Sequence, residues 1–294
     1  MKTFAVNCAR TAVSLALGLA TLAAQPSPKP QKELDPLEQH FQAAQTFQLA
    51  DDLPHAAEEY RKAICIGLQR LGNLRSSEQK PSEAVELLTT ATQSDPSNTD
   101  AVIDLAVAHF YAGDLAKARS IVEPVLNREP SNFRALDLAG KIEFMHGSFQ
   151  AAADRLQAAL GIKSDFDVAY SLALADLELK KLPQAIVLFD EMKASMKSPP
   201  ELRVLIGRAY LESGFPEQAA GEFEKAILAN PKASRAHFLL GLAYLGQGDK
   251  RLADAKQQFE LELALSPKDD LSRYYLGVVH FQLHELGAAE QTLR

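Results

Sequence analysis

The sequence predicts an all-α protein in which one helix-turn-helix unit is repeated along most of the chain. Alanine recurs inside apolar, helix-like segments at intervals of 34, 34, 33, 34, 36 and 34 residues. The series consists of Ala84, Ala118, Ala152, Ala185, Ala219, Ala255 and Ala289. A period of this size indicates one supersecondary unit copied many times. The recurrence of glycine and proline at the ends of these segments supports the same conclusion.

Composition narrows the range of partners. The chain has 294 residues, of which 47% are hydrophobic, and it carries a net charge of −7 without any tryptophan. Binding to a nucleic-acid backbone requires lysine and arginine clustered on one face, and the body of the chain contains no basic run. We therefore expect no nucleic-acid partner.

The first 24 residues are typical of a secretory signal peptide. Lys2 and Arg10 lie before or beside an apolar stretch at residues 11–24, and Ala24 offers a small residue for cleavage. We expect cleavage after Ala24 and export to the periplasm or the medium. The alternative is an uncleaved membrane anchor formed by residues 11–24, although this stretch is shorter than the roughly 20 residues that span a bilayer.

A proline-rich flexible linker is expected over residues 25–36, followed by the repeat array over residues 37–294. Cys65 would be the only cysteine of the cleaved chain, so no internal disulfide can form. A free cysteine usually packs as a small apolar residue, and we expect the same of Cys65.

The repeating unit reads as helix, tight turn, helix and proline stop. Residues 99–111 carry apolar side chains at helical spacing and are followed by Gly113 and Asp114; a second amphipathic run covers residues 115–128 and stops before Pro130. Two antiparallel helices cannot bury both apolar faces alone, so neighbouring copies must stack. The approximate units are 37–64, 65–98, 99–132, 133–165, 166–199, 200–233, 234–269 and an incomplete 270–294.

Two departures from the period are informative. The interval from Ala56 to Ala84 is only 28 residues, so residues 57–75 are expected to form one longer helix. The last unit supplies a first helix and only part of a second, with no polar capping helix after it. Natural arrays cover their last apolar face with such a cap, and we therefore expect the chain to be a fragment of a longer protein.

The pattern resembles the tetratricopeptide repeat (TPR) family. That family has a leucine and a small residue in the first helix, then a glycine turn, an alanine early in the second helix and a large apolar residue four positions later. The first-helix pairs are Leu71-Gly72, Leu105-Ala106, Ala139-Gly140, Leu172-Ala173, Ile206-Gly207, Leu240-Gly241 and Leu276-Gly277. The resemblance implies a right-handed α-solenoid of stacked antiparallel helix pairs, the TPR superhelix. The small residue allows the second helix to approach closely.

The resemblance also implies a concave groove lined by the first helices. Positions 2, 5, 9 and 12 of each unit face this groove in the family. The candidate partner-binding residues taken from these positions are Arg134, Lys141, Arg208, Arg235, Phe238, Tyr274 and Phe281. The lysine, asparagine and arginine set with which some members clamp a terminal carboxylate is missing, which favours an extended or helical peptide with apolar anchors. The alternative is that Phe238, Tyr274 and Phe281 pack against the next helix or against a capping helix beyond the array.

Catalytic and metal-binding patterns are weak. His280 and His284 lie four residues apart near Glu285, but no glutamate follows His280 directly and no third ligand is visible. The glycines between Gly241 and Gly248 fit the packing and turn positions of one repeat rather than a phosphate loop. We therefore expect no catalytic residues, metal site, cofactor or small-molecule substrate.

The leading hypothesis is a non-catalytic scaffold that binds a partner protein or peptide in the concave groove, in the bacterial cell envelope. The alternative is that these repeats form the docking or sensory region of a larger enzyme, with a catalytic domain beyond residue 294. A membrane contact is expected only through an uncleaved N-terminal segment.

Overall fold

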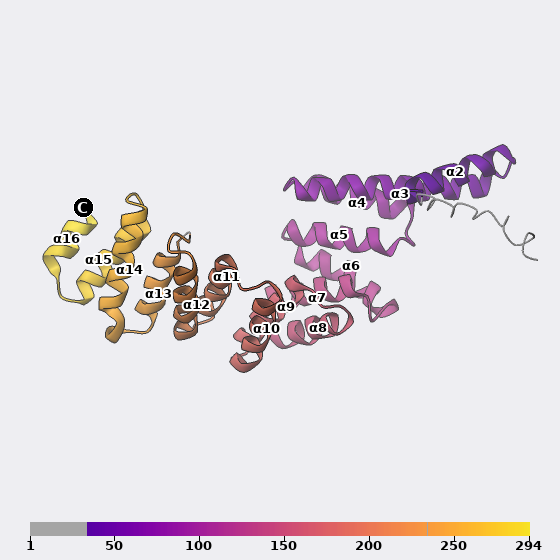
Figure 1. Cartoon of the computed structure of the whole chain (residues 1–294). Helices are drawn as coiled ribbons and strands as arrows, with labels where there is room; N and C mark the ends of the chain where they lie inside the picture. The colour runs from indigo at the N-terminus through magenta and orange to yellow at the C-terminus, as the bar shows by residue number, and fades with distance from the viewer. Residues whose placement is uncertain (1–33, 234) are drawn as a thin grey trace, which may run out of the picture. The chain divides into compact units, whose positions relative to one another are not determined.

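The computed structural model describes residues 34–233 and 235–294, and this part of the chain is helical without strands (Figure 1). The all-α prediction is confirmed. The expected signal peptide and residues 25–33 of the expected linker lie outside the described residues. The helices are α2 (Pro36–Leu49), α3 (Leu53–Ser77), α4 (Pro81–Ser94), α5 (Thr99–Tyr111), α6 (Leu115–Arg128), α7 (Phe133–Met145), α8 (Phe149–Ile162), α9 (Phe166–Glu178), α10 (Leu182–Ser195), α11 (Pro200–Glu212), α12 (Pro216–Ala229), α13 (Ala236–Gly246), α14 (Leu252–Leu265), α15 (Asp270–Gln282) and α16 (Leu286–Leu293), with a 3₁₀ turn η1 (Asp249–Arg251) before α14.

The described part of the chain divides into two compact units, of which the first ends at residue 63 and the second covers residues 64–294. In the first, the Asp35 side chain caps α2 by accepting a hydrogen bond from the Leu37 N–H. The Phe41 and Tyr60 rings meet edge to face at 5.7 Å between centroids. Helix α3 is 25 residues long, which confirms the expectation of one longer helix over residues 57–75.

In the second unit, each helix from α4 to α16 packs against its neighbour in the sequence. Asparagine or aspartate side chains cap several first helices by accepting a backbone N–H, as Asn98 does for α5 and Asn132 for α7. Proline opens several second helices, including α4 and α12, where its missing N–H costs no hydrogen bond. These local signals explain where those helices begin.

The alanine series forms the centre of the stack. Six of its members are fully buried, and Ala289 is 6% exposed. The large residue four positions further along the second helix is also fully buried in six successive copies: Leu88, Val122, Leu156, Phe189, Phe223 and Phe259. The predicted packing of an alanine and a large apolar side chain between helix pairs is therefore confirmed.

The glycines of the first helices allow this close packing. A Cβ atom on Gly207 would lie 2.6 Å from Cε1 of Phe223, and one on Gly140 would lie 2.6 Å from Cγ of Leu156. Such distances are shorter than van der Waals contact, so only glycine fits without a shift of the second helix.

Cys65 lies in the core, as expected for a free cysteine, and is fully buried. Burial raises the pKa of its thiol, and the nearby Asp95 carboxylate raises it further. A thiol in this environment is a poor nucleophile, because the thiolate is the reactive form.

Candidate functional site

A set of partly exposed apolar side chains lies on the first helices of the second unit. It consists of Val107, Phe110, Phe144, Leu211, Leu242, Leu245 and Val278. All occupy the groove positions that the repeat pattern assigns. We call this set the first-helix face. Partly exposed apolar side chains recurring on successive elements provide anchors for a partner.

One pocket opens on this face between α5 and α7. It has a volume of about 160 Å³ and is lined by Ile103, Val107, Phe110, Tyr111, Phe133, Arg134, Asp137, Leu138 and Lys141. Two of the predicted site residues, Arg134 and Lys141, thus lie together. The volume of this α5–α7 pocket is close to that of a cavity that holds benzene, about 150 Å³.

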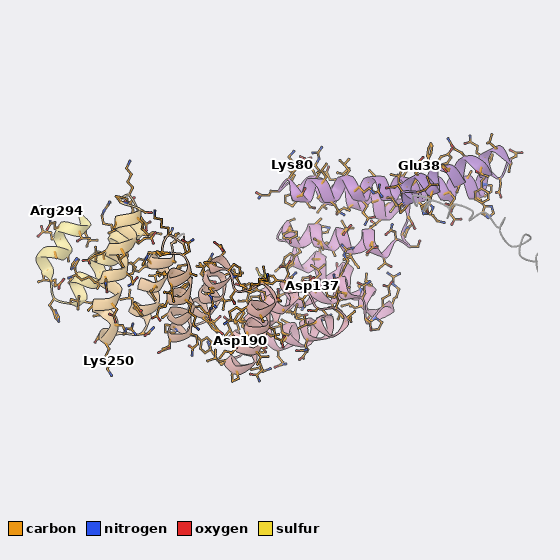
Figure 2. All side chains as sticks on the ribbon, in the orientation of Figure 1. Glu38, Lys80, Asp137, Asp190, Lys250 and Arg294 are labelled. Carbon is orange, nitrogen blue, oxygen red and sulfur yellow. The ribbon has the colours of Figure 1, made fainter. Side chains whose placement is uncertain are left out.

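Asp137, labelled in Figure 2, lines this pocket from α7 and has one fully enclosed oxygen without a partner in the described structure. The Lys141 Nζ lies 2.7 Å from Oδ2 of Asp137. Oδ1 of Asp137 is buried and has no hydrogen-bond partner among the described residues. Burial raises the pKa of Asp137; Lys141 opposes this shift, whereas Asp165 and Asp167 add to it. Because buried polar atoms in proteins are almost always paired, this enclosed oxygen adds to the cost of holding Asp137 charged.

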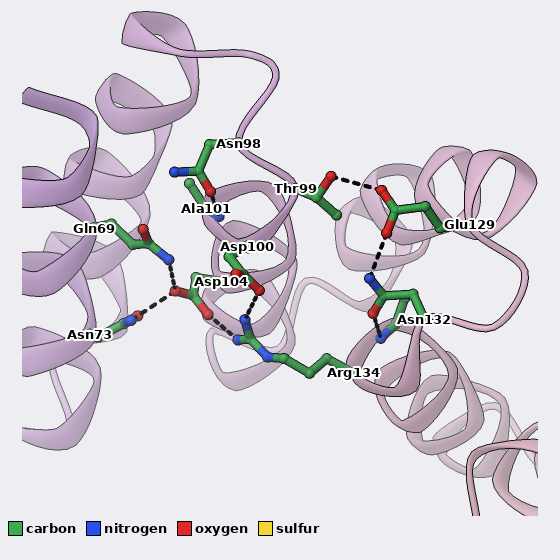
Figure 3. Close-up of polar contacts among 11 residues, drawn as sticks. Gln69, Asn73, Asn98, Thr99, Asp100, Ala101, Asp104, Glu129, Asn132 and Arg134 are labelled. Atoms are coloured by element: carbon green, nitrogen blue, oxygen red, sulfur yellow. Dashed lines mark hydrogen bonds and ion pairs between the residues drawn. The ribbon is translucent and has the colours of Figure 1, made fainter. Parts of the chain in front are cut away.

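Arg134 belongs to a polar network that connects three helices (Figure 3). Its guanidinium donates to Asp104 and, at 2.8 Å, to Oδ1 of Asp100. The amides of Gln69 and Asn73 on α3 each donate to Oδ2 of Asp104 at 2.7 Å. Asp104 is only 6% exposed, so its charge depends on these partners. Arg134 therefore has a structural role in addition to its place at the pocket.

The other two predicted arginines lie elsewhere on the array. The Arg208 side chain is 55% exposed and lies 3.3 Å from Glu212 on the same helix. Arg235 precedes α13 with a φ of 58°, and its guanidinium lies 4.5 Å from the centre of the Phe238 ring. Neither lines the α5–α7 pocket.

Phe238 differs from the expectation that it faces a ligand. It is 6% exposed, and its ring centroid lies 6.0 Å from that of Phe259 and 5.8 Å from that of Tyr275. The physical reason is the aromatic cluster in which α13, α14 and α15 meet. Phe238 is therefore a core residue, in agreement with the alternative that it packs against a neighbouring helix.

Tyr274 and Phe281 on α15 are exposed, by 55% and 65%. Tyr274 meets the ring of Tyr275 edge to face at 5.3 Å. Both are accessible in the described part of the chain. Their role in binding a partner remains a prediction.

The two histidines of α15 and its turn do not converge. Nδ1 of His280 lies 2.5 Å from Oε2 of Glu285, and His284 occupies the turn with a φ of 61°. Lys256 holds the same glutamate at 2.8 Å, and its hydrogen bond lowers the pKa of Glu285. Within residues 34–233 and 235–294, no three side chains of the metal-binding types are grouped as a metal site would require.

Sequence reasoning missed three buried carboxylates on the first helices, Asp104, Glu143 and Asp176, each 6% or 7% exposed. The sequence contains a pattern that could have identified two of them. Glu143 and Asp176 occupy the repeat position at which Tyr210 and Tyr244 stand in later copies. An acid that replaces an aromatic core residue indicates either an internal ion pair or a polar pocket.

Comparisons with known proteins agree with this architecture. Two tetratricopeptide repeat models match residues 76–142 and 204–270. A tetratricopeptide repeat protein from Parabacteroides merdae superposes with a TM-score of 0.53 at 17% identity, covering 83% of this chain and 98% of that chain. A repeat-containing protein from Cytophaga hutchinsonii gives a TM-score of 0.57 at 16% identity, over 76% of this chain and 93% of that one.

The fold and these matches define an α-solenoid of repeated helix pairs. The chain carries tetratricopeptide repeats.

A curated relative is much longer than this chain. The putative cellulose synthase operon protein C of Escherichia coli O157:H7 is 28% identical over 207 residues, which cover 67% of this chain but 17% of that protein. The similarity therefore concerns the repeats and only a small part of the relative. In the part of the chain that the structure describes, we find no helix with the length and apolar character needed to span a membrane.

Proposed function

We propose that this protein is a non-catalytic scaffold of the bacterial cell envelope that binds a segment of a partner protein on its first-helix face. The observation that carries the proposal is the α5–α7 pocket, which combines apolar side chains of α5 and α7 with the charged side chains of Arg134, Asp137 and Lys141. Tetratricopeptide repeats typically serve in protein-protein interaction, which supports the same assignment.

The pocket favours a particular kind of segment. Val107, Phe110 and Phe133 provide apolar contacts for one bulky side chain of about the size of an aromatic ring. The charged residues of the lining, Arg134, Asp137 and Lys141, are available to contact polar groups beside that side chain. The partly exposed residues of the first-helix face would add further apolar anchors along an extended or helical peptide.

Partner capture from an envelope extract tests the proposal. Tyr111 lines the pocket and is 71% exposed, so Tyr111→Asp should leave the fold intact while opposing an apolar ligand. The matched control is Leu228→Asp on α12, where the native leucine is 85% exposed and lies outside the pocket. We expect recovery of the main partner to fall about tenfold or more for Tyr111→Asp, about 1.4 kcal/mol of binding, and to stay unchanged for the control.

Both variants should melt within about 2 °C of the wild type, since exposed substitutions change stability by about 0.5 kcal/mol or less. Equal recovery with both variants would contradict the assignment of the partner to this face.

Export is part of the proposal and has a separate test. The basic, apolar and small-residue order of residues 1–24 supports cleavage after Ala24. Mass spectrometry of the protein purified from its native host should show a mature chain that begins at Gln25. A chain that retains residues 11–24 would instead support the membrane-anchored alternative.

A second candidate is that the array docks or senses for a larger enzyme. The matched repeats make up 17% of the curated relative, so repeats of this kind form a small part of a much longer protein in that case. Reading the gene beyond codon 294 separates the two. A catalytic domain there would overturn the scaffold proposal, and a stop after one capping helix would overturn the enzyme.

A further inference from the structure

A second pocket lies away from the first-helix face, between α8 and α10, with α9 at its floor. Its volume is about 420 Å³. The lining residues are Gln150, Ala153, Asp154, Gln157, Leu172, Asp176, Lys181, Gln184, Val187 and Leu188. We call it the α8–α10 pocket. Its walls come from the second helices of two successive pairs, and its floor comes from the first helix between them. It shares no residue with the α5–α7 pocket.

The floor of this pocket carries an unpaired acid. Asp176 is 7% exposed, and its carboxylate makes no hydrogen bond or ion pair with any described residue. Burial raises the pKa of Asp176 and the Lys181 ammonium lowers it only in part, while Lys181 Nζ donates to Oε1 of Gln150 at 2.9 Å. Gln150 in turn donates to Asp154 at 2.7 Å. Because Asp176 is 7% exposed, its carboxylate is only partly hydrated through the pocket opening, and its charge is costly.

The equivalent position in the preceding repeat shows that Asp176 lacks a cationic partner in the described chain. Glu143 lies one repeat earlier than Asp176 and is similarly buried, but Arg119 on α6 donates a guanidinium hydrogen bond to it. The residue of α8 that corresponds to Arg119 is Ala153. Each directly follows a member of the alanine series, Ala118 in α6 and Ala152 in α8. A short side chain therefore replaces the arginine above Asp176, and this leaves both the charge unpaired and the pocket open.

One repeat later, the position is filled in another way. Tyr210 occupies it and is buried, and Tyr244 in the following repeat donates its hydroxyl to Glu224 at 2.6 Å. Each of these copies thus fills the position from within the chain, either by an internal ion pair or by an aromatic ring. Among these four copies, Asp176 lacks both solutions in the described structure.

We propose that the α8–α10 pocket binds the guanidinium group of an arginine side chain that a partner protein inserts, with the Asp176 carboxylate as its counter-ion. The arginine would take the place that Arg119 occupies opposite Glu143. This site is independent of the first-helix face and adds a second, charge-selective contact.

The pocket walls match the shape and chemistry of an arginine. A guanidinium presents five N–H donors in one plane, and its methylene stem packs on apolar surface. Leu172, Leu188 and Ala153 provide that surface. The side-chain oxygens of Gln157 and Gln184 are acceptors at the pocket wall, and Asp154 adds a second negative charge. Lys181 is the opposing positive charge, but its hydrogen bond to Gln150 holds its ammonium there.

A direct test uses a capped tripeptide with arginine at its centre, titrated into the full-length protein and followed by amide NMR shifts. The matched probe contains citrulline, which has nearly the same shape as arginine but no charge. We expect saturable binding of the arginine peptide with shifts confined to α8, α9 and α10, and at least tenfold weaker binding of citrulline. Equal binding of the two peptides would overturn the proposal.

Two acid variants locate the counter-ion. Asp176→Asn should weaken binding of the arginine peptide about tenfold or more, because one charged hydrogen-bond partner is lost. Asp190→Asn on α10 is the matched control, because the Asp190 side chain is 63% exposed and lies outside the pocket lining, and we expect it to change affinity less than threefold. Full affinity in the Asp176→Asn protein would contradict the proposed role of this carboxylate. Tyr111→Asp should leave peptide binding unchanged, which separates this site from the first-helix face.

A substitution within the chain can supply the guanidinium group that Asp176 lacks. Ala153→Arg reproduces the arrangement of Arg119 and Glu143, so we expect a higher melting temperature and loss of binding of the arginine peptide. The same substitution in an Asp176→Asn background should give no increase in melting temperature, because the charge that it would satisfy is gone. A rise of equal size in both backgrounds would mean that packing alone causes it, and would overturn the pairing.

Stability in the absence of ligand provides an independent readout. Burial raises the pKa of Asp176, and Lys181 opposes this only in part. A carboxyl whose folded pKa is raised destabilises the fold as pH rises through that pKa. Asp176→Asn should therefore be more stable than the wild type at neutral pH, and the difference should shrink as pH falls below the raised pKa. A less stable variant at neutral pH would show that the carboxylate already has a stabilising partner.

Discussion

Phe238→Ala is expected to lower the free energy of unfolding by about 3–5 kcal/mol, the usual cost of removing a buried phenylalanine ring. The ring is enclosed by Phe259 and Tyr275 and covered by the Arg235 guanidinium. Its removal leaves a cavity among three helices that cannot close without moving them. Chemical denaturation followed by circular dichroism would measure the loss.

The matched control for this substitution is Tyr274→Ala on α15. Tyr274 is 55% exposed and has only an edge contact with Tyr275, so we expect a change of about 1 kcal/mol or less. Similar losses for the two variants would contradict the assignment of Phe238 to the core and Tyr274 to the surface. Partner capture should be compared only for Tyr274→Ala, because the Phe238 variant alters the fold itself.

Gly207→Val is expected to destabilise the array by about 3 kcal/mol, since overpacking of a filled core costs about 1–3 kcal/mol and occasionally more. The new Cβ would lie 2.6 Å from Cε1 of Phe223, and two other ring atoms would lie 2.9 Å away. The Phe223 ring is fully buried and has no room to turn aside. The two helices of the pair must therefore separate, which disturbs packing against the next pair as well.

A glycine on the partner helix provides the control. Gly221 lies inside α12, and no atom of the described structure lies within 4 Å of the Cβ that Gly221→Ala would add. This change should stabilise the protein by about 0.5–1 kcal/mol, because alanine loses less backbone entropy than glycine in a helix. Both changes in the free energy of unfolding are measured by the same denaturation experiment. Opposite signs would confirm that lack of space, rather than helix propensity, determines the effect at Gly207. A stabilised Gly207→Val protein would refute the close-packing account.

The sequence predicted the architecture well, because the architecture depends on a pattern repeated many times. Every copy from Ala84 onward carries the alanine and a large apolar residue four positions later, and four of the described turns carry a glycine with positive φ. A departure in one copy therefore does not obscure the pattern. The buried alanine series and the contact between Gly207 and Phe223 agree with this prediction. Nearest-neighbour stacking makes such a pattern sufficient, since each unit needs only the unit beside it.

The candidate sites were less predictable, because they depend on where copies differ. Phe238 and Tyr274 occupy the same position of successive units, yet one is buried and the other exposed. The difference arises from Tyr275, whose ring stacks on Phe259 at 5.8 Å and encloses Phe238. No spacing rule distinguishes these residues before the three helices are placed together.

The sequence by itself determined the helix-pair unit, its period and the residues that form the core of the stack. These follow from local propensity and from apolar side chains at helical spacing, both of which are properties of consecutive residues. Only the tertiary structure decided which charges find partners. Arg119 reaches Glu143 across two helices, whereas Ala153 leaves Asp176 unpaired at the floor of the α8–α10 pocket. Ion pairing between helices depends on distances of a few ångströms, which the order of residues does not specify.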